Sequence, residues 1–129
     1  MRRNAVTDAH IDPARDHAAD LIQAALAEAS RRPVVKSFFD EATFPVSHIV
    51  RDPNSRACAI IDSVLDYDPA SGRTSTASAD ALIAYVEAED LEVHWLLETH
   101  AHADHLTGAD EIRNRTGAPI GIGEKITRV

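Results

Sequence analysis

The chain has 129 residues, of which 44% are hydrophobic and 26% are charged, and this composition is typical of one small domain with its own core. The formal net charge is −8, and an acidic surface repels phosphate backbones and anionic membranes, so we expect neither nucleic acid nor membrane as a partner. The single cysteine, Cys58, excludes a disulfide within the chain, no apolar run approaches the ~20 residues of a membrane span, and we expect a cytoplasmic protein.

The first predicted element is a helix that opens at Pro13, after a poorly ordered segment of residues 1–12, and ends at residues 31–33. Apolar side chains recur at helical spacing along it, which predicts a surface helix that packs by one stripe. The stripe comprises Ala18, Leu21, Ile22, Ala25, Leu26 and Ala29. We therefore treat residues 1–34 as an N-terminal extension and residues 35–129 as the domain.

Two strands are predicted next, over residues 43–52 and 56–62, joined by the turn sequence "DPNS" into a hairpin. The second strand is apolar enough to be covered on both faces. Residues 66–76 are predicted to be a polar loop.

The remaining elements alternate between helix and strand. They are a helix over residues 77–91 with Ser78 as a candidate N-cap, a strand over 92–98, a helix over 106–117 with Gly117 as its C-cap, and a short strand over 118–123. Such alternation predicts an α/β layered fold.

Metal-binding side chains are concentrated in "HAHADH", directly after the strand over residues 92–98. Imidazole and carboxylate are the usual ligands of zinc, iron and manganese. His100 and His102 lie two residues apart, so in an extended segment they face one metal together. Asp104 and His105 follow after the chain turns, and they either face a second metal or support the first. The alternatives are a solvated polar loop and a zinc finger, and the lone cysteine disfavours the finger.

The motif "HAHADH" matches the H-x-H-x-D-H signature of the metallo-β-lactamase superfamily. The wider "ETHAHADHLTGADEI", with "AIIDSVLD" upstream, most resembles the branch of persulfide dioxygenases, glyoxalase II and β-lactamase-like hydrolases. The similarity runs from about Val35 to the end of the chain. It implies an α/β fold that is the N-terminal half of an αββα sandwich, with the metal site at one edge between two sheets.

The resemblance also implies the roles of the site residues. In two-metal members of the superfamily, the positions of His100 and His102 bind the first metal, and those of Asp104 and His105 bind the second. In persulfide dioxygenases a single iron is held at the position of His100 together with a later His and a later Asp. The implied cofactor is Fe(2+) or Zn(2+), and Asp104 is the candidate catalytic residue.

Three functions remain open on the sequence. The resemblance favours a persulfide dioxygenase that oxidises glutathione persulfide, and the alternative is a zinc hydrolase of lactams or of thioesters such as S-lactoylglutathione. Either enzyme acts on a small molecule, chiefly one derived from a thiol. Because no His follows His105 and family domains are longer, we expect the 129 residues alone to be an inactive fragment that self-associates as a homo-oligomer.

The histidines and polar residues outside the motif have separate predicted roles. His48 and His94 are predicted to be structural strand residues, His10 and His17 to be solvated, and Cys58 to pack in the core. Asp62, at the end of a strand, is a candidate to support a metal ligand, and Thr99 a candidate to fix the turn through its hydroxyl. Tyr67 and Arg73 are candidates to border the pocket.

Overall fold

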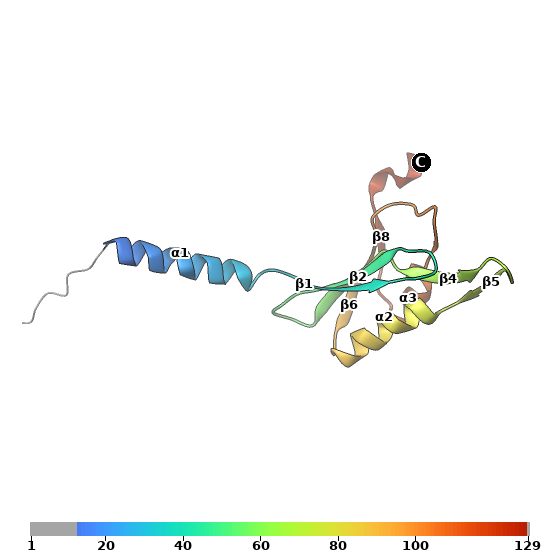
Figure 1. Cartoon of the computed structure of the whole chain (residues 1–129), viewed down its shortest axis with the longest axis horizontal. Coiled ribbons are helices and arrows are strands. Elements are labelled where there is room, and N and C mark those ends of the chain that lie inside the picture. The colour runs from blue at the N-terminus through green and yellow to red at the C-terminus, as the bar shows by residue number, and fades with distance from the viewer. Residues whose placement is uncertain (1–12, 129) are drawn as a thin grey trace, which may run out of the picture. The chain divides into compact units, whose positions relative to one another are not determined.

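The computed structural model describes residues 13–128, which belong to two compact units, Met1–Arg32 and Pro33–Val129. The first unit holds helix α1, Pro13–Ala29, which begins at Pro13 as predicted (Figure 1). Its apolar side chains Leu21, Ile22 and Leu26 are 58–59% exposed, so no described residue of this unit covers the predicted stripe. The segment before Pro13, including His10, lies outside the described residues. No helix between residues 13 and 128 is long and apolar enough to cross a membrane.

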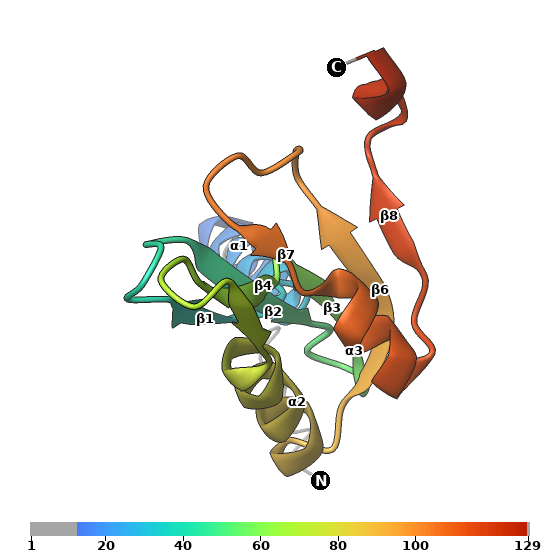
Figure 2. The same ribbon diagram turned by 90° about the vertical axis from the view of Figure 1, so that its right-hand side faces the viewer.

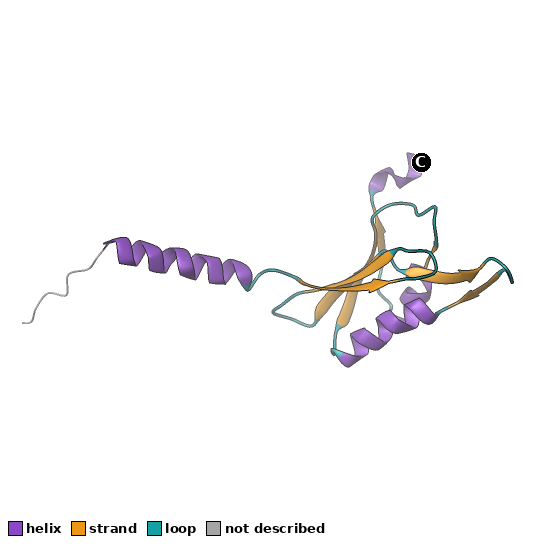
Figure 3. Cartoon of the chain, in the orientation of Figure 1, coloured by secondary structure: helices purple, strands orange, loops and turns teal. Residues whose placement is uncertain are grey.

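The second unit contains two sheets and two α-helices (Figures 1 and 3). The five-stranded sheet has the order β1-β2-β3-β6-β8, and the three-stranded sheet has the order β5-β4-β7. The larger sheet comprises β1 (Val34–Phe39), β2 (Val46–Arg51), β3 (Ala57–Ile61), β6 (Glu92–Glu98) and β8 (Ile120–Ile122). The smaller sheet comprises β4 (Val64–Asp68), β5 (Arg73–Ser75) and β7 (Leu106–Thr107). The helices are α2 (Ala77–Ala88), α3 (Ala109–Thr116) and the 3-10 helix η1 (Glu124–Arg128). The predicted α/β class is confirmed.

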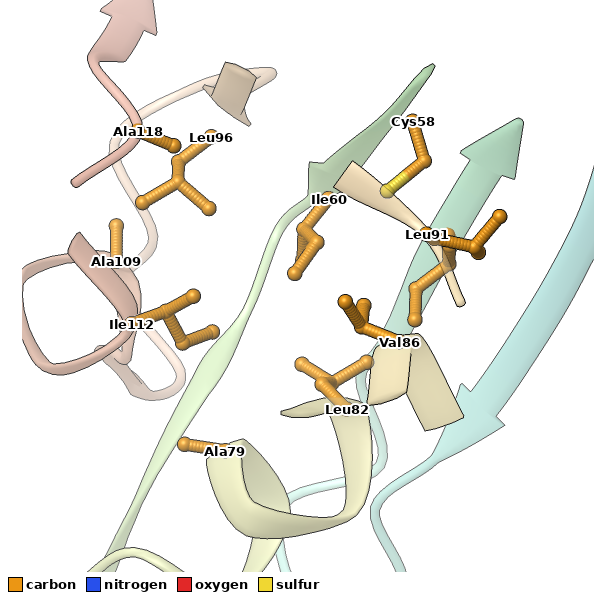
Figure 4. Close-up of a cluster of buried hydrophobic side chains, with 11 residues drawn as sticks. Cys58, Ile60, Ala79, Leu82, Val86, Leu91, Leu96, Ala109, Ile112 and Ala118 are labelled. Atoms are coloured by element: carbon orange, nitrogen blue, oxygen red, sulfur yellow. The ribbon is translucent and has the colours of Figure 1, made fainter. Parts of the chain in front are cut away.

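One face of the five-stranded sheet is packed against both α-helices (Figure 4). Ala79, Leu82 and Val86 of α2 and Ala109 and Ile112 of α3 meet Ile49, Cys58, Ile60 and Leu96 of the sheet, all of them buried. Full burial of a valine, leucine or isoleucine side chain stabilises a fold by about 1.5–3 kcal/mol. The prediction that Cys58 packs in the core is confirmed, and burial raises the pKa of its thiol.

The strand β3 was wrongly expected to be covered on both faces. Its buried side chains, Cys58 and Ile60, alternate with the partly exposed Ala57, Ala59 and Ile61. The helices cover only one face of the sheet, and small or aliphatic residues on the other face give the strand its uniformly apolar sequence.

The predicted hairpin of β2 and β3 is confirmed, but the sequence prediction missed β1 beside it. The predicted start of β2 at residue 43 was also wrong, because residues 41–43 form a turn, Phe44 follows it with φ 66°, and the strand begins at Val46. The carboxylate of Asp40 organises this turn by accepting hydrogen bonds from the amide and the hydroxyl of Thr43. The strand β1 was missed because the apolar and polar residues of its sequence, VVKSFF, do not alternate. In the structure nearly all of its residues are exposed, so no buried face imposes such a pattern.

The expected polar loop over residues 66–76 is largely a β-hairpin formed by β4 and β5. Gly72, at φ +68°, lies in the turn, where a left-handed backbone favours glycine. The predicted N-cap role of Ser78 was also wrong. Asp66 of β4 accepts a 2.8 Å hydrogen bond from the Ser78 amide and a 2.6 Å bond from its hydroxyl, so a carboxylate from the hairpin satisfies the first turn of α2.

The helix predicted over residues 106–117 begins later, at Ala109, because Leu106–Thr107 pair with β4 as β7. Gly108 joins the two, and a Cβ atom on it would lie 2.6 Å from the Val64 carbonyl oxygen, so only glycine fits this close approach. The predicted C-cap is confirmed: Gly117 has φ 75° and donates its amide proton to Arg113 O.

Candidate metal centre

The candidate centre lies where β3 and β6 end. These strands run parallel with Ile61 paired to Leu97, so the residues that follow them emerge at the same sheet edge. Asp62, with φ 52°, turns away from β3 and donates its amide to Leu97 O at 2.9 Å. Figure 2 shows the loop over residues 99–105 leaving the end of β6 and returning to the smaller sheet as β7.

Asp62 ties the two strand ends together through its carboxylate. Oδ1 accepts a 2.8 Å hydrogen bond from the Thr99 amide, and Oδ2 accepts a 2.7 Å bond from the Thr99 hydroxyl. His102 Nε2 lies 3.1 Å from Oδ1. Burial raises the pKa of Asp62, but the bonds from Thr99 and His102 outweigh burial and leave this pKa below its ordinary value. The carboxylate is therefore ionised at neutral pH and acts only as an acceptor.

This ionised carboxylate selects the tautomers of two histidines. Because Asp62 can only accept, the neutral form of His102 carries its proton on Nε2, and in that tautomer Nδ1 has a free lone pair. The Thr99 hydroxyl donates its hydrogen bond to Asp62, so its oxygen accepts one from His100 Nδ1 at 2.8 Å, and this leaves Nε2 of a neutral His100 free. Both rings thus present an unprotonated nitrogen, as metal ligation requires.

The three histidines of the motif lie in a row with His102 in the middle. The ring centroid of His102 lies 4.2 Å from that of His100 and 4.2 Å from that of His105. The prediction that His100 and His102 lie close together at the end of the strand is therefore confirmed. His105 comes close to the same ring although the chain turns between them.

His105 is buried, with a side chain only 1% exposed, yet neither ring nitrogen has a hydrogen-bond partner. Asp104 Oδ1 lies 3.4 Å from His105 Nδ1 without the geometry of a hydrogen bond. Buried polar atoms are nearly always paired, so two orphaned nitrogens on one ring fit a group that is bound there, and a metal ion is such a group.

Two sets of side chains bring possible ligand atoms within 4.8 Å of one another, namely Asp62, His100 and His102, and then His102, Asp104 and His105. The donors are nitrogen and oxygen atoms, which suit a divalent metal such as Zn(2+) or Fe(2+). The oxygens of Asp62 are already occupied by Thr99 and His102, so we assign it to support rather than ligation. The residues present fit a metal, while the individual ligand roles stay predictions.

Asp104 differs from the buried residues around it because its side chain is 57% exposed. A hydrogen bond from its own backbone amide is the largest cause that lowers the pKa of Asp104; burial opposes this shift, and His105 and His102 add to it. The carboxylate is therefore ionised at neutral pH and reaches solvent.

Glu98 also belongs to this site, and the sequence analysis did not single it out. Its side chain is 8% exposed, Oε1 accepts a hydrogen bond from Thr107, and Oε2 lies 3.2 Å from His102 Nε2 without a hydrogen-bond partner. The sequence did contain a signal for this residue. Glu98 ends the predicted strand two residues before His100, and alternate residues of an extended segment share a face, so Glu98 could have been predicted to face the motif.

A cavity of about 670 Å³ opens beside the histidines. His102, Asp104 and His105 form one wall, the Asp40–Thr43 turn forms another, and the β4–β5 hairpin closes a third. Tyr67 and Arg73 line it, which confirms that they border a pocket next to the motif. The volume falls within the range of small-molecule sites.

The other histidines lie away from the motif where they are described. His48 is a partly buried residue of β2 that bonds Ser37 at 2.9 Å, and His94 on β6 is exposed beside Glu92. His17, on α1, is exposed. These placements agree with the structural and solvated roles predicted for them.

Comparison with known proteins gives one consistent family. The family described as the metallo-beta-lactamase superfamily matches residues 41–129. A metallo-hydrolase of Burkholderia pseudomallei is 58% identical over 95 residues, which are 74% of this chain and 32% of that protein. Glyoxylase B2 of Dictyostelium discoideum is 48% identical over 83 residues, which are 62% of this chain and 28% of that protein. The chain thus spans about a third of the length of these relatives.

A solved structure has the same fold. The crystal structure of ETHE1 from Myxococcus xanthus superposes with a TM-score of 0.56 at 26% identity, and the match covers 67% of this chain and 34% of that one.

Proposed function

The chain belongs to the metallo-beta-lactamase superfamily, and from this membership we propose that the whole protein is a metal-dependent hydrolase whose metal centre includes His100, His102, Asp104 and His105. The observation that carries the proposal is His105, a buried histidine with two unpartnered ring nitrogens beside an exposed carboxylate. His102 lies between His105 and His100, and its one free nitrogen, Nδ1, can join only one of the two neighbouring groups of ligands. The other donors lie on both sides of His102, with His100 on one side and Asp104 and His105 on the other, and this favours a pair of metals over a single one.

A divalent metal bound here supplies Lewis acidity and lowers the pKa of water toward neutrality. The residues of the chain do the remaining work. Asp62 and Thr99 hold the two imidazoles in the tautomers that leave Nδ1 of His102 and Nε2 of His100 unprotonated. The Asp104 carboxylate, with its lowered pKa, is a weak base, so it orients an attacking water through an accepted hydrogen bond and does not store the proton.

The substrate we propose is a thioester, of which S-lactoylglutathione is the example to test first. The relatives with hydrolase and glyoxylase names support this class, and the open cavity beside the histidines offers space for an acyl thiol. Lactams contain a similar electrophilic carbonyl and form the comparison substrate.

A second candidate is oxidation of glutathione persulfide, favoured by the wider motif "ETHAHADHLTGADEI". In that reaction one metal would suffice, and Asp104 and His105 would only support its ligands. The two functions therefore differ in what His105 does.

The dividing experiment replaces His105 with Ala in the whole protein. Metal content, thioester hydrolysis and oxygen uptake on glutathione persulfide are then measured on the same preparation. For the hydrolase, the wild type carries two metals, and the variant loses one of them with most of its turnover. For the dioxygenase, metal content stays at one and oxygen uptake is only reduced. His94→Ala, an exposed histidine outside the motif, is the matched control and changes neither reading. A wild type that binds no metal and converts neither substrate would refute both functions.

A further inference from the structure

Besides His102 and His105 of the motif, the described lining of the cavity beside the metal centre holds one basic residue, Arg73 of β5. Its other charged side chains are all acidic, and they belong to Asp40, Asp66, Asp68 and Asp104. The formal charge of the chain is also negative, at −8. An anionic substrate entering this cavity is repelled unless positive charge is placed inside it.

The acids of the lining do not use Arg73. Asp40 accepts hydrogen bonds from the Thr43 amide and hydroxyl, and Asp66 accepts them from Ser78. Asp68 lies directly opposite Arg73 across the hairpin, but its carboxylate bonds the Ala70 amide in the turn instead. Asp104 faces His102 and His105.

The backbone of Arg73 pairs with β4, but its guanidinium has neither a hydrogen bond nor an ion pair with any side chain in the described part of the chain. This contrasts with the other arginines of the second unit that lie near an acid. Arg51, Arg56, Arg113 and Arg115 each pair with a carboxylate. The guanidinium of Arg73 is therefore available for a ligand of the cavity, because the opposed carboxylate of Asp68 is engaged in the turn.

We propose that Arg73 binds a carboxylate of the substrate and so makes this cavity selective for anionic acyl thiols. The inference deepens the proposed function and rests on it for the place of the reacting bond. Guanidinium offers paired donors in the geometry of a carboxylate, and such charge-assisted bonds are stronger than neutral ones.

The test measures binding and therefore does not depend on turnover. The probes are S-methylglutathione, an unreactive thioether with free carboxylates, and its dimethyl ester, which has the same shape without those charges. Calorimetric titration of the whole protein should show that the wild type prefers the free acid. Arg73→Ala should weaken binding of the free acid about tenfold, because the bond between guanidinium and carboxylate is charge-assisted but partly exposed to solvent. The affinity for the ester should not change.

Two further variants sharpen the result. Arg73→Lys keeps the charge without the fork and should fall between Arg73→Ala and the wild type. Arg113→Ala removes an arginine of α3 that pairs with Asp110 outside the cavity lining, and should bind both probes as the wild type does.

The remaining outcomes overturn the inference. Equal loss of acid and ester in Arg73→Ala would assign the residue to the hairpin structure, and no loss, or no preference for the acid in the wild type, would exclude a carboxylate anchor. If the protein hydrolyses no thioester but Arg73→Ala still weakens binding of the free acid alone, the proposed function is wrong and the role of Arg73 in binding a carboxylate is supported. If turnover is present, the same variant should raise KM for S-lactoylglutathione and leave kcat nearly unchanged.

Discussion

His102 Nε2 lies 3.1 Å from Asp62 Oδ1, and the two side chains are only 9% and 15% exposed. The residues are 40 positions apart in the sequence and meet because β3 and β6 are parallel neighbours whose ends coincide. A second route leads from the same carboxylate through the Thr99 hydroxyl to His100. One acid thus orients two histidines of the motif.

Replacing Asp62 with Asn should weaken metal binding. Asparagine tolerates the positive φ of this position, so the backbone is kept, but its amide no longer fixes the Nε2 proton of His102. Loss of such a supporting partner typically lowers metal affinity about 10–100-fold. Competition titration against a chromophoric chelator measures the change.

Asp90→Asn is the matched control. Asp90 has the same φ of 52° but pairs with Arg56, away from the histidines. The metal affinity of the Asp90→Asn variant should equal that of the wild type. If both variants lose affinity to the same degree, the effect belongs to the turn conformation and not to the contact with His102.

Thr99→Val tests the relay to His100. Valine has nearly the shape of threonine but leaves His100 Nδ1 without an acceptor and Asp62 with one donor fewer. We expect metal affinity to fall by about tenfold or more and the free energy of unfolding to fall by about 1 kcal/mol. Thr99→Ser keeps the hydroxyl and should restore most of both. Equal affinities for the valine and serine variants would argue against the relay.

The turn at Asp40 should make the fold sensitive to acid. The Thr43 hydroxyl lowers the pKa of Asp40 below its ordinary 3.8, aided by backbone amides and by His105 and opposed by burial. A lowered pKa in the folded state adds stability that is fully present above pH 3.8 and is lost as pH falls through the lower folded value.

Thr43→Val removes the largest cause of this shift. Unfolding free energies measured with urea should therefore depend less on pH, below about pH 4, in the variant than in the wild type. Thr74→Val, an exposed threonine in the lining of the same cavity, is the control and should keep the wild-type slope. An unchanged slope for Thr43→Val would show that its hydroxyl does not set this pKa.

Self-association of the 129 residues stays a prediction. Trp95 and Ile122 are 50% and 41% exposed on the five-stranded sheet, and β1 and β8 are its edge strands. Exposed apolar side chains and unpaired strand edges both favour association. Sedimentation velocity should show species larger than a monomer, and Trp95→Lys should reduce them more than His94→Lys, which adds the same charge at the neighbouring exposed position. A monomer at every concentration would contradict the prediction.

The sequence by itself determined the parts that depend on local patterning. The helical spacing after Pro13, the strand that precedes the motif and the C-cap at Gly117 could all be predicted, because each depends on residues within a few positions of one another. The spacing of His100 and His102 likewise predicted their proximity, since alternate residues of an extended segment share a face.

Only the tertiary structure decided what comes from distant segments. It paired β1 with β2, folded the expected polar loop over residues 66–76 into a hairpin, and gave the capping of α2 to Asp66 instead of Ser78. It also brought Asp62 to His102 and left the guanidinium of Arg73 unpaired in the cavity. Strand pairing and the direction of a buried carboxylate depend on contacts across many residues of sequence, and local propensity carries no information about them.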